Sequence, residues 1–134
     1  MKEVVRTEAA PAPFQGAPYS QAIRVGDLVF VSGQLALEPG ATAIQADGIG
    51  EQTERVMANL KAILEAAGSG LDRLVKTTVF LQDLADFQGM NEVYARHVGE
   101  TPPARSTVEV ARLPSGALVE IEAIALVGEG AAAR

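Results

Sequence analysis

Residues 118–127 read Leu-Val-Glu-Ile-Glu-Ala-Ile-Ala-Leu-Val, and this stretch decides the class of fold. Successive residues of a β-strand point to opposite faces of the sheet. One face of this strand carries Val119, Ile121, Ala123, Ala125 and Val127, and the other carries Leu118, Ile124 and Leu126. Helices can cover one of these apolar faces, and a second exposed apolar face usually marks an interface. The stretch therefore predicts an oligomeric sheet protein, without deciding its symmetry.

The residues before this strand predict the other elements. Apolar and β-branched runs predict strands at residues 1–6, 23–25, 28–31, 74–81 and 106–112, and apolar residues at helical spacing predict helices at 51–67 and 83–98. In the first helix Val56, Leu60, Ile63 and Leu64 face inward, and in the second Leu84, Phe87, Val93 and Tyr94 do so. The order β-β-β-α-β-α-β-β is typical of an α+β protein with two helices on one face of a mixed sheet. We expect a single domain over residues 1–128 and a disordered tail at 129–134.

Composition excludes several classes of protein. The 134 residues include no cysteine and a single histidine, so disulfides, thiolate chemistry and a multi-histidine metal site are excluded. The net charge of −6 disfavours nucleic acid as a partner, because an acidic surface repels phosphates. No apolar run reaches the roughly 18 residues of a membrane span, and no signal peptide precedes the domain. We expect a cytoplasmic protein without a membrane or nucleic-acid partner.

Arg105 is the first candidate for a binding residue. It follows Pro102-Pro103-Ala104 and opens a predicted strand, so the prolines set the place from which its side chain projects. A guanidinium held in one place can bind a carboxylate through two parallel hydrogen bonds. The alternative is a structural ion pair with one of the 17 acidic residues.

Glu120 and Glu122 are the candidates for acid–base chemistry. They share one face of the final strand and interrupt an apolar run. An unpaired buried carboxylate is unfavourable, so these groups are either exposed at a sheet edge or functional. A buried one beside a ligand could orient or deprotonate a water molecule.

Tyr19 and Gly33 have both a functional and a structural interpretation, and His97 is either a catalytic base or a residue that stabilises the end of a helix. Tyr19 could offer its hydroxyl to a ligand or cover the core, and Gly33 after Ser32 could permit a close approach or only mark a bend. Asn91 would face water as most helical asparagines do. His97 suits the last turn of the second helix, where a basic side chain is favourable.

Several segments together resemble the RidA/YjgF family of reactive-intermediate deaminases. They cover roughly residues 14–127 and include Ala17-Pro18-Tyr19-Ser20-Gln21-Ala22, Val29-Phe30-Val31-Ser32-Gly33-Gln34, Asn91-Glu92-Val93-Tyr94, Pro102-Pro103-Ala104-Arg105-Ser106-Thr107-Val108-Glu109 and Val119-Glu120-Ile121-Glu122-Ala123. The segment around Arg105 is the most specific of them. Thr107 stands where some of these deaminases have cysteine.

The resemblance implies a chorismate-mutase-like α+β fold and a homotrimer with ligand clefts between subunits. It also implies hydrolysis of 2-enamino and 2-imino acids to 2-keto acids and ammonia, with no metal or organic cofactor. Arg105 and Glu120 match the catalytic positions, the first binding the substrate carboxylate and the second positioning the attacking water. Tyr19, Ser32, Gly33, Asn91 and Thr107 match positions that contact or support the substrate.

Not every member of this family is a deaminase, so two other functions stay open. One is a regulatory trimer that binds small ligands without turnover, and another is a chaperone-like trimer. Ribonuclease activity is attributed to some relatives, but the acidic charge and the few aromatic residues disfavour it here.

Overall fold

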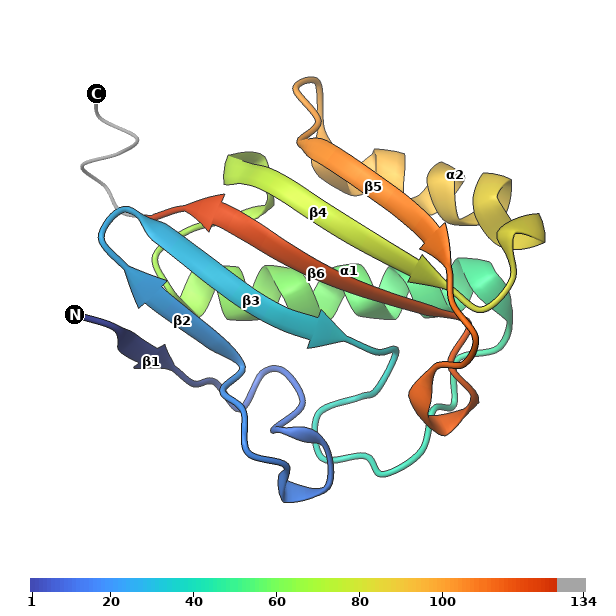
Figure 1. Ribbon diagram of the computed structural model, residues 1–134, viewed down its shortest axis with the longest axis horizontal. Coiled ribbons are helices and arrows are strands. Elements are labelled where there is room, and N and C mark those ends of the chain that lie inside the picture. Colours follow the sequence, from blue (N-terminus) through green and yellow to red (C-terminus); the bar gives the residue numbers. More distant parts are fainter. Residues whose placement is uncertain (128–134) are drawn as a thin grey trace.

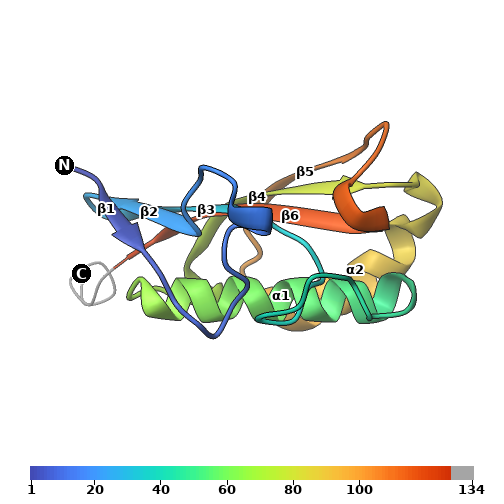
Figure 2. The same ribbon diagram turned by 90° about the horizontal axis from the view of Figure 1, so that it is seen from below.

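The computed structural model describes residues 1–127, which form a six-stranded sheet with two helices on one of its faces (Figures 1 and 2). The strands are β1 (Glu3–Val5), β2 (Ala22–Val25), β3 (Leu28–Gln34), β4 (Leu74–Leu81), β5 (Ala104–Glu109) and β6 (Val119–Leu126), and the helices are α1 (Gly48–Ala66) and α2 (Phe87–Val98). The expected α+β class and mixed sheet are confirmed. The expected tail at 129–134 lies outside the described residues.

The last strand lies in the interior of the sheet. The strand order is β1-β2-β3-β6-β4-β5, and β6 runs antiparallel to both β3 and β4. The strands β3 and β4 therefore run parallel to each other and are joined through α1, while β4 pairs in parallel with β5 and is joined to it through α2. Parallel neighbours need such long crossovers, and both helices cover the same face.

The core lies between α1 and one face of β6. Val56, Leu60, Ile63 and Leu64 are fully buried, as their helical spacing predicted. They pack in one cluster with Val119, Ile121, Ala123 and Ala125 of β6. Each large aliphatic side chain buried in this way contributes about 1.5–3 kcal/mol relative to an exposed one.

Several expected boundaries were wrong: α1 begins at Gly48 instead of residue 51, for example, and β3 ends at Gln34 instead of residue 31. The second helix begins at Phe87, because residues 84–86 form a 3-10 turn in which Asp83 accepts a hydrogen bond from the Ala85 N–H. Leu84 is 47% exposed in this turn and does not face the core. Strand β5 begins earlier than 106–112, at Ala104, which is paired with Lys76 of β4. It also ends earlier, at Glu109, because Glu109 is paired with Leu81, where β4 ends.

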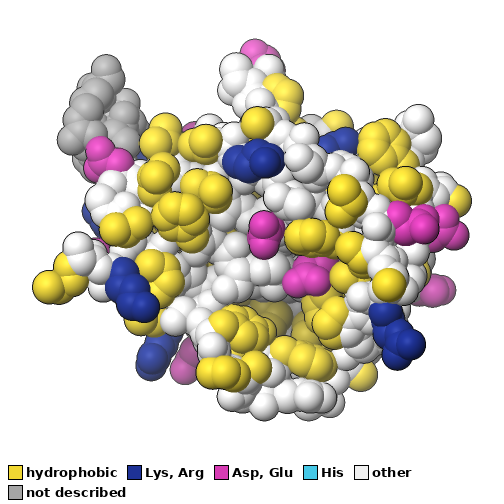
Figure 3. All heavy atoms as spheres, viewed as in Figure 1, with side chains coloured by type: hydrophobic (Ala, Val, Ile, Leu, Met, Phe, Trp, Pro, Cys, Tyr) yellow, Lys and Arg dark blue, Asp and Glu magenta, His cyan; other side chains and the backbone are white. Residues whose placement is uncertain are grey.

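The sheet face opposite the helices is open and largely apolar at one end. Phe30 and Leu126, on adjacent strands, are each 42% exposed, and Val4 and Val25 extend the patch over β1 and β2. Figure 3 shows hydrophobic side chains gathered on this face and acidic side chains near its centre, beside a hollow. The predicted second apolar face is therefore confirmed, and no segment of residues 1–127 covers the patch around Phe30 and Leu126.

Candidate functional site

Arg105 lies on the edge strand β5 with its side chain toward α2. Its Cζ atom is 4.9 Å from the centre of the Tyr94 ring and 5.5 Å from that of Phe87. Its Nη1 lies 3.9 Å from the sulfur of Met90, a weak acceptor. Phe87, Met90 and Tyr94 are spaced at helical intervals along one face of α2, so three successive contacts hold the partly buried guanidinium in place.

Within residues 1–127 Arg105 forms no ion pair with a carboxylate. The alternative of a structural ion pair is therefore wrong for the residues that the structure describes. Contact with an aromatic face is electrostatically favourable, but it leaves the N–H donors at the edge of the guanidinium free. Arg105 can thus offer several donors to an incoming anion.

Asn91 and Thr107 belong to the same region of the molecule. Thr107 follows Arg105 by two residues on β5 and shares its face, while Asn91 lies one turn after Phe87 on α2. The Oδ1 atom of Asn91 and the Oγ1 atom of Thr107 are buried without a hydrogen-bond partner among the described residues. The expectation that Asn91 faces water was wrong for this oxygen. Buried polar atoms left unpaired are unfavourable, which is typical of places that a ligand or partner completes.

A second group of candidates surrounds a hollow of about 570 Å³ on the other side of the sheet. Tyr19, Ser32, Gly33 and Glu120 all line it, together with Glu122. Glu120 and Glu122 share this face of β6, as their spacing predicted. Because β6 is an interior strand, the expected alternative of a sheet edge was wrong, but Glu122 is exposed on the open face and only Glu120 is half-buried.

Glu120 lies directly over the backbone of Gly33. A Cβ atom added to Gly33 would overlap the Glu120 carboxylate and would lie 2.9 Å from its carboxyl carbon. The glycine therefore makes room for the carboxylate within the chain. Burial raises the pKa of Glu120 above its ordinary value, and the negative charge of Glu122 raises it further. Such a carboxyl keeps its proton to a higher pH than an exposed one, which suits a group that exchanges protons with a ligand.

The hydroxyl groups of Tyr19 and Ser32 have opposite roles in their hydrogen bonds within the chain. The Tyr19 hydroxyl oxygen accepts a hydrogen bond of 2.6 Å from the Phe14 N–H, so its own proton is free to be donated. The Ser32 hydroxyl donates to the Ser20 carbonyl at 2.6 Å, so its oxygen is left to accept. These two hydroxyls thus present a free donor and a free acceptor to the hollow, in addition to the carboxylates of Glu120 and Glu122.

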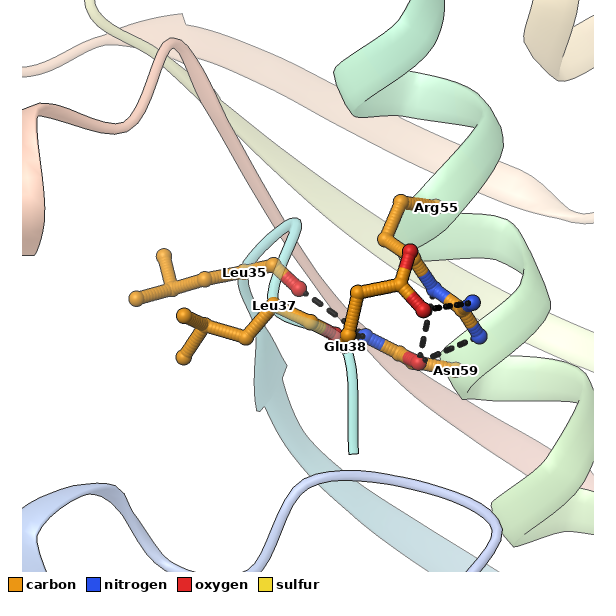
Figure 4. A network of polar contacts seen from close by, with 5 residues as sticks. All are labelled: Leu35, Leu37, Glu38, Arg55 and Asn59. Atoms are coloured by element: carbon orange, nitrogen blue, oxygen red, sulfur yellow. Dashed lines mark hydrogen bonds and ion pairs between the residues drawn. The ribbon is translucent and has the colours of Figure 1, made fainter. Parts of the chain in front are cut away.

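The apolar part of the wall of the hollow is held from behind by α1. Leu35 and Leu37 line it, and the buried Asn59 side chain donates to their carbonyl oxygens at 3.1 and 2.8 Å (Figure 4). Arg55 donates to the Asn59 oxygen at 2.8 Å and pairs with Glu38 at 3.2 Å. The loop after β3 is therefore fixed by polar contacts at Leu35, Leu37 and Glu38, and not by packing alone.

The two groups of candidates lie on opposite faces of one sheet. Arg105 is paired with the buried Thr77 on the helix side, whereas Glu120 is paired with Phe80 on the open side. Neighbours across strands point to the same face, so the guanidinium of Arg105 and the carboxylate of Glu120 diverge within one chain. A single chain therefore keeps the group around Arg105 and the group around Glu120 apart.

His97 belongs to neither group. It lies in the last turn of α2, as expected, and its Nε2 is 2.5 Å from a carboxylate oxygen of Glu54 on α1. In residues 1–127 no group of three or more acidic or histidine side chains could hold a metal ion. The helices of this part of the chain are also too short or too polar to cross a membrane.

Three residues near the candidate site escaped the sequence reasoning. Tyr94 was assigned to the core from its spacing, and its contact with Arg105 depends on how α2 docks. Thr77 was read only as part of a buried strand. Asn59 carried a usable signal, because it is a polar residue beside the apolar stripe of α1 and is fully buried.

Comparison with known proteins gives consistent results over almost the whole chain. The family model described as Endoribonuclease L-PSP matches residues 7–127. A RutC family protein of Pyrococcus abyssi is 55% identical over 124 residues, which are 92% of this chain and 96% of that protein. The chloroplastic Reactive Intermediate Deaminase A of Arabidopsis thaliana is 49% identical over 92% of this chain and 65% of its own length. The crystal structure of Escherichia coli TdcF with bound serine superposes with a TM-score of 0.86 at 41% identity, covering 94% of this chain and 99% of TdcF.

Proposed function

The chain belongs to the RidA/YjgF family, and on this premise we propose that it hydrolyses small 2-enamino and 2-imino acids to 2-keto acids and ammonia. The observation that carries the proposal is Arg105, a partly buried cation over two aromatic rings with no acidic partner in residues 1–127. Its free donors suit a small carboxylate. The name of the Arabidopsis relative and the serine bound to TdcF support a ligand that carries both a carboxylate and a nitrogen.

We further propose that the group around Arg105 and the group around Glu120 are two half-sites of one site that forms between chains. We propose a homotrimer in which the open sheet faces pack around a central barrel, covering the apolar patch around Phe30 and Leu126. Each cleft would take Arg105, Asn91 and Thr107 from one chain and the Glu120 half-site from its neighbour. A cyclic trimer places two different surfaces of each chain against each other, which is what two half-sites on opposite faces need.

In the proposed reaction Arg105 binds the carboxylate of the substrate. An enamine such as 2-aminoacrylate tautomerises to the 2-imino acid, and water adds to the C=N carbon. Glu120 orients this water and takes its proton, and returning a proton to the nitrogen lets ammonia leave the tetrahedral intermediate. The uncatalysed hydrolysis is already easy, so fixing the carboxylate and the water supplies the acceleration. Every step uses groups of the chain and water only.

The experiment is release of pyruvate from 2-aminoacrylate, which a serine or threonine dehydratase generates in the assay. We expect wild-type protein to accelerate the release, Arg105→Ala to abolish the acceleration while remaining assembled, and Arg105→Lys to restore it only in part, because lysine cannot form the two parallel bonds.

A well-folded wild-type protein that accelerates nothing would refute the deaminase. Binding of a 2-keto acid without ammonia release would instead favour the regulatory trimer. The same preparations incubated with RNA address the endoribonuclease of the family model's description, and the net charge of −6 leads us to expect no cleavage.

A further inference from the structure

The position of Arg105 depends on something other than an ion pair. Its guanidinium is closest to the Tyr94 ring, at 4.9 Å, and lies farther from Phe87, at 5.5 Å. A contact of this kind is favourable only while the cation stays over the ring face. The Tyr94 ring, together with Phe87 and Met90, therefore helps to set where the donors of Arg105 point.

Tyr94 is itself fixed from below by the sheet. The Tyr94 side chain is buried, and its hydroxyl forms a hydrogen bond of 2.6 Å with the hydroxyl of Thr77, which is fully buried on β4. Thr77 is also the residue that pairs with Arg105 across β4 and β5. The same threonine thus fixes the ring, through its side chain, beside the strand position from which the arginine projects.

We infer that Tyr94 is a positioning residue for the substrate carboxylate, and that the Thr77 hydroxyl fixes the ring that carries Arg105. The inference rests on the proposed role of Arg105 as the carboxylate-binding group. Neither residue needs to touch the substrate. Tyr94 supplies a face that holds the cation without occupying its donors, and Thr77 prevents the ring from turning or sliding.

A purely structural role predicts something different. A buried hydroxyl pair between a helix and a sheet stabilises the fold wherever it occurs, and breaking it leaves one hydroxyl unpaired. In that case variants would unfold more easily but, once folded, would bind a carboxylate normally. Stability and carboxylate binding therefore have to be measured separately on each variant.

The test is calorimetric binding of 2-oxobutanoate and of its uncharged amide, 2-oxobutanamide, to assembled protein. The positioning role predicts that Tyr94→Leu weakens 2-oxobutanoate binding by about 10-fold, because the ring face is lost. Tyr94→Phe keeps the ring and is expected to lose only about 3-fold. Amide binding should hardly change, since it does not need a charged partner.

The hydroxyl pair is tested by a double-mutant cycle. Thr77→Val, Tyr94→Phe and the double variant each lack the same bond, so we expect similar losses of about 3-fold that do not add. Val93→Ala is the matched control: it truncates a buried side chain on α2 that faces Gly50 of α1, and should lower stability without changing either affinity.

The outcomes separate the inference from the proposed function. Wild-type protein that binds 2-oxobutanoate through Arg105, together with Tyr94→Leu that binds it equally well, would overturn the inference and leave the proposed function intact. Equal losses for the acid and the amide would also overturn it, because they would indicate general loosening. Wild-type protein that binds neither ligand and releases no pyruvate would remove the proposed function, and the inference with it.

Discussion

Mixing two inactive variants tests directly whether the half-sites meet between chains. Arg105→Ala chains keep an intact Glu120 half-site, and Glu120→Gln chains keep an intact Arg105 half-site. The two residues lie on opposite faces of one sheet, so in the proposed trimer each cleft would combine half-sites from two different chains. In trimers assembled at random from equal amounts, a cleft is intact when a Glu120→Gln chain supplies the arginine and an Arg105→Ala chain supplies the carboxylate. Each condition holds for half of the chains, so about one quarter of the clefts should be wild type.

The assay is pyruvate release from 2-aminoacrylate by proteins that are unfolded, mixed and refolded together, compared with the same variants refolded apart. We expect about 25% of wild-type activity from the mixture and almost none from either variant alone. Arg105→Ala mixed with Asn91→Ala is the matched control. Both residues belong to the same half-site, so this mixture should not exceed the mean of its two parents. A mixture of Arg105→Ala and Glu120→Gln that stays inactive although it forms mixed trimers would refute the reasoning.

Four further predictions concern the hollow and the assembly. Gly33→Ala should lower the rate roughly 100-fold by displacing the Glu120 carboxylate, with little change in melting temperature because the backbone there suits any residue; wild-type rates would contradict it. Glu122→Gln should lower the pKa of Glu120 by removing a negative neighbour, so the loss of kcat/KM on acidification should move to lower pH, and an unmoved profile would exclude this coupling. Asn59→Leu should lower the free energy of unfolding by roughly 2–4 kcal/mol in urea melts, since two backbone carbonyls lose their donor. Phe30→Glu should shift the mass measured by light scattering toward the monomer, whereas an unchanged mass would place the interface elsewhere.

The sequence alone predicted the local parts of the fold well. The hairpin around Gly26 and the buried stripe of α1 follow from turn chemistry and from helical spacing, which depend only on neighbouring residues. The pattern of residues 118–127 predicted both the buried face and the open apolar face. The predictions failed where a neighbouring element sets the boundary. The end of β5 follows the end of β4, and the turn at 84–86 exposes a leucine that its spacing had placed in the core.

For the candidate site, the sequence indicated which residues could take part in binding or acid–base chemistry. A guanidinium after two prolines and two carboxylates in an apolar strand were recognisable, because charged groups in such places need a partner or a function. The sequence could not decide whether Arg105 had an acidic partner, since its neighbours come from α2 and from another strand. Nor could it show that the space over Gly33 is filled by Glu120, which lies 87 residues later in the chain.

The sequence by itself therefore determined the order and type of the main elements, the two apolar faces and the candidate residues for binding a small carboxylate. Only the tertiary structure decided the place of β6 inside the sheet, and with it the division of those residues between opposite faces. The physical reason is that strand order depends on contacts between residues far apart in the chain, which no local period encodes. Spacing alone had assigned Tyr94 to the core. Its contact with Arg105 likewise depends on how α2 docks against the sheet.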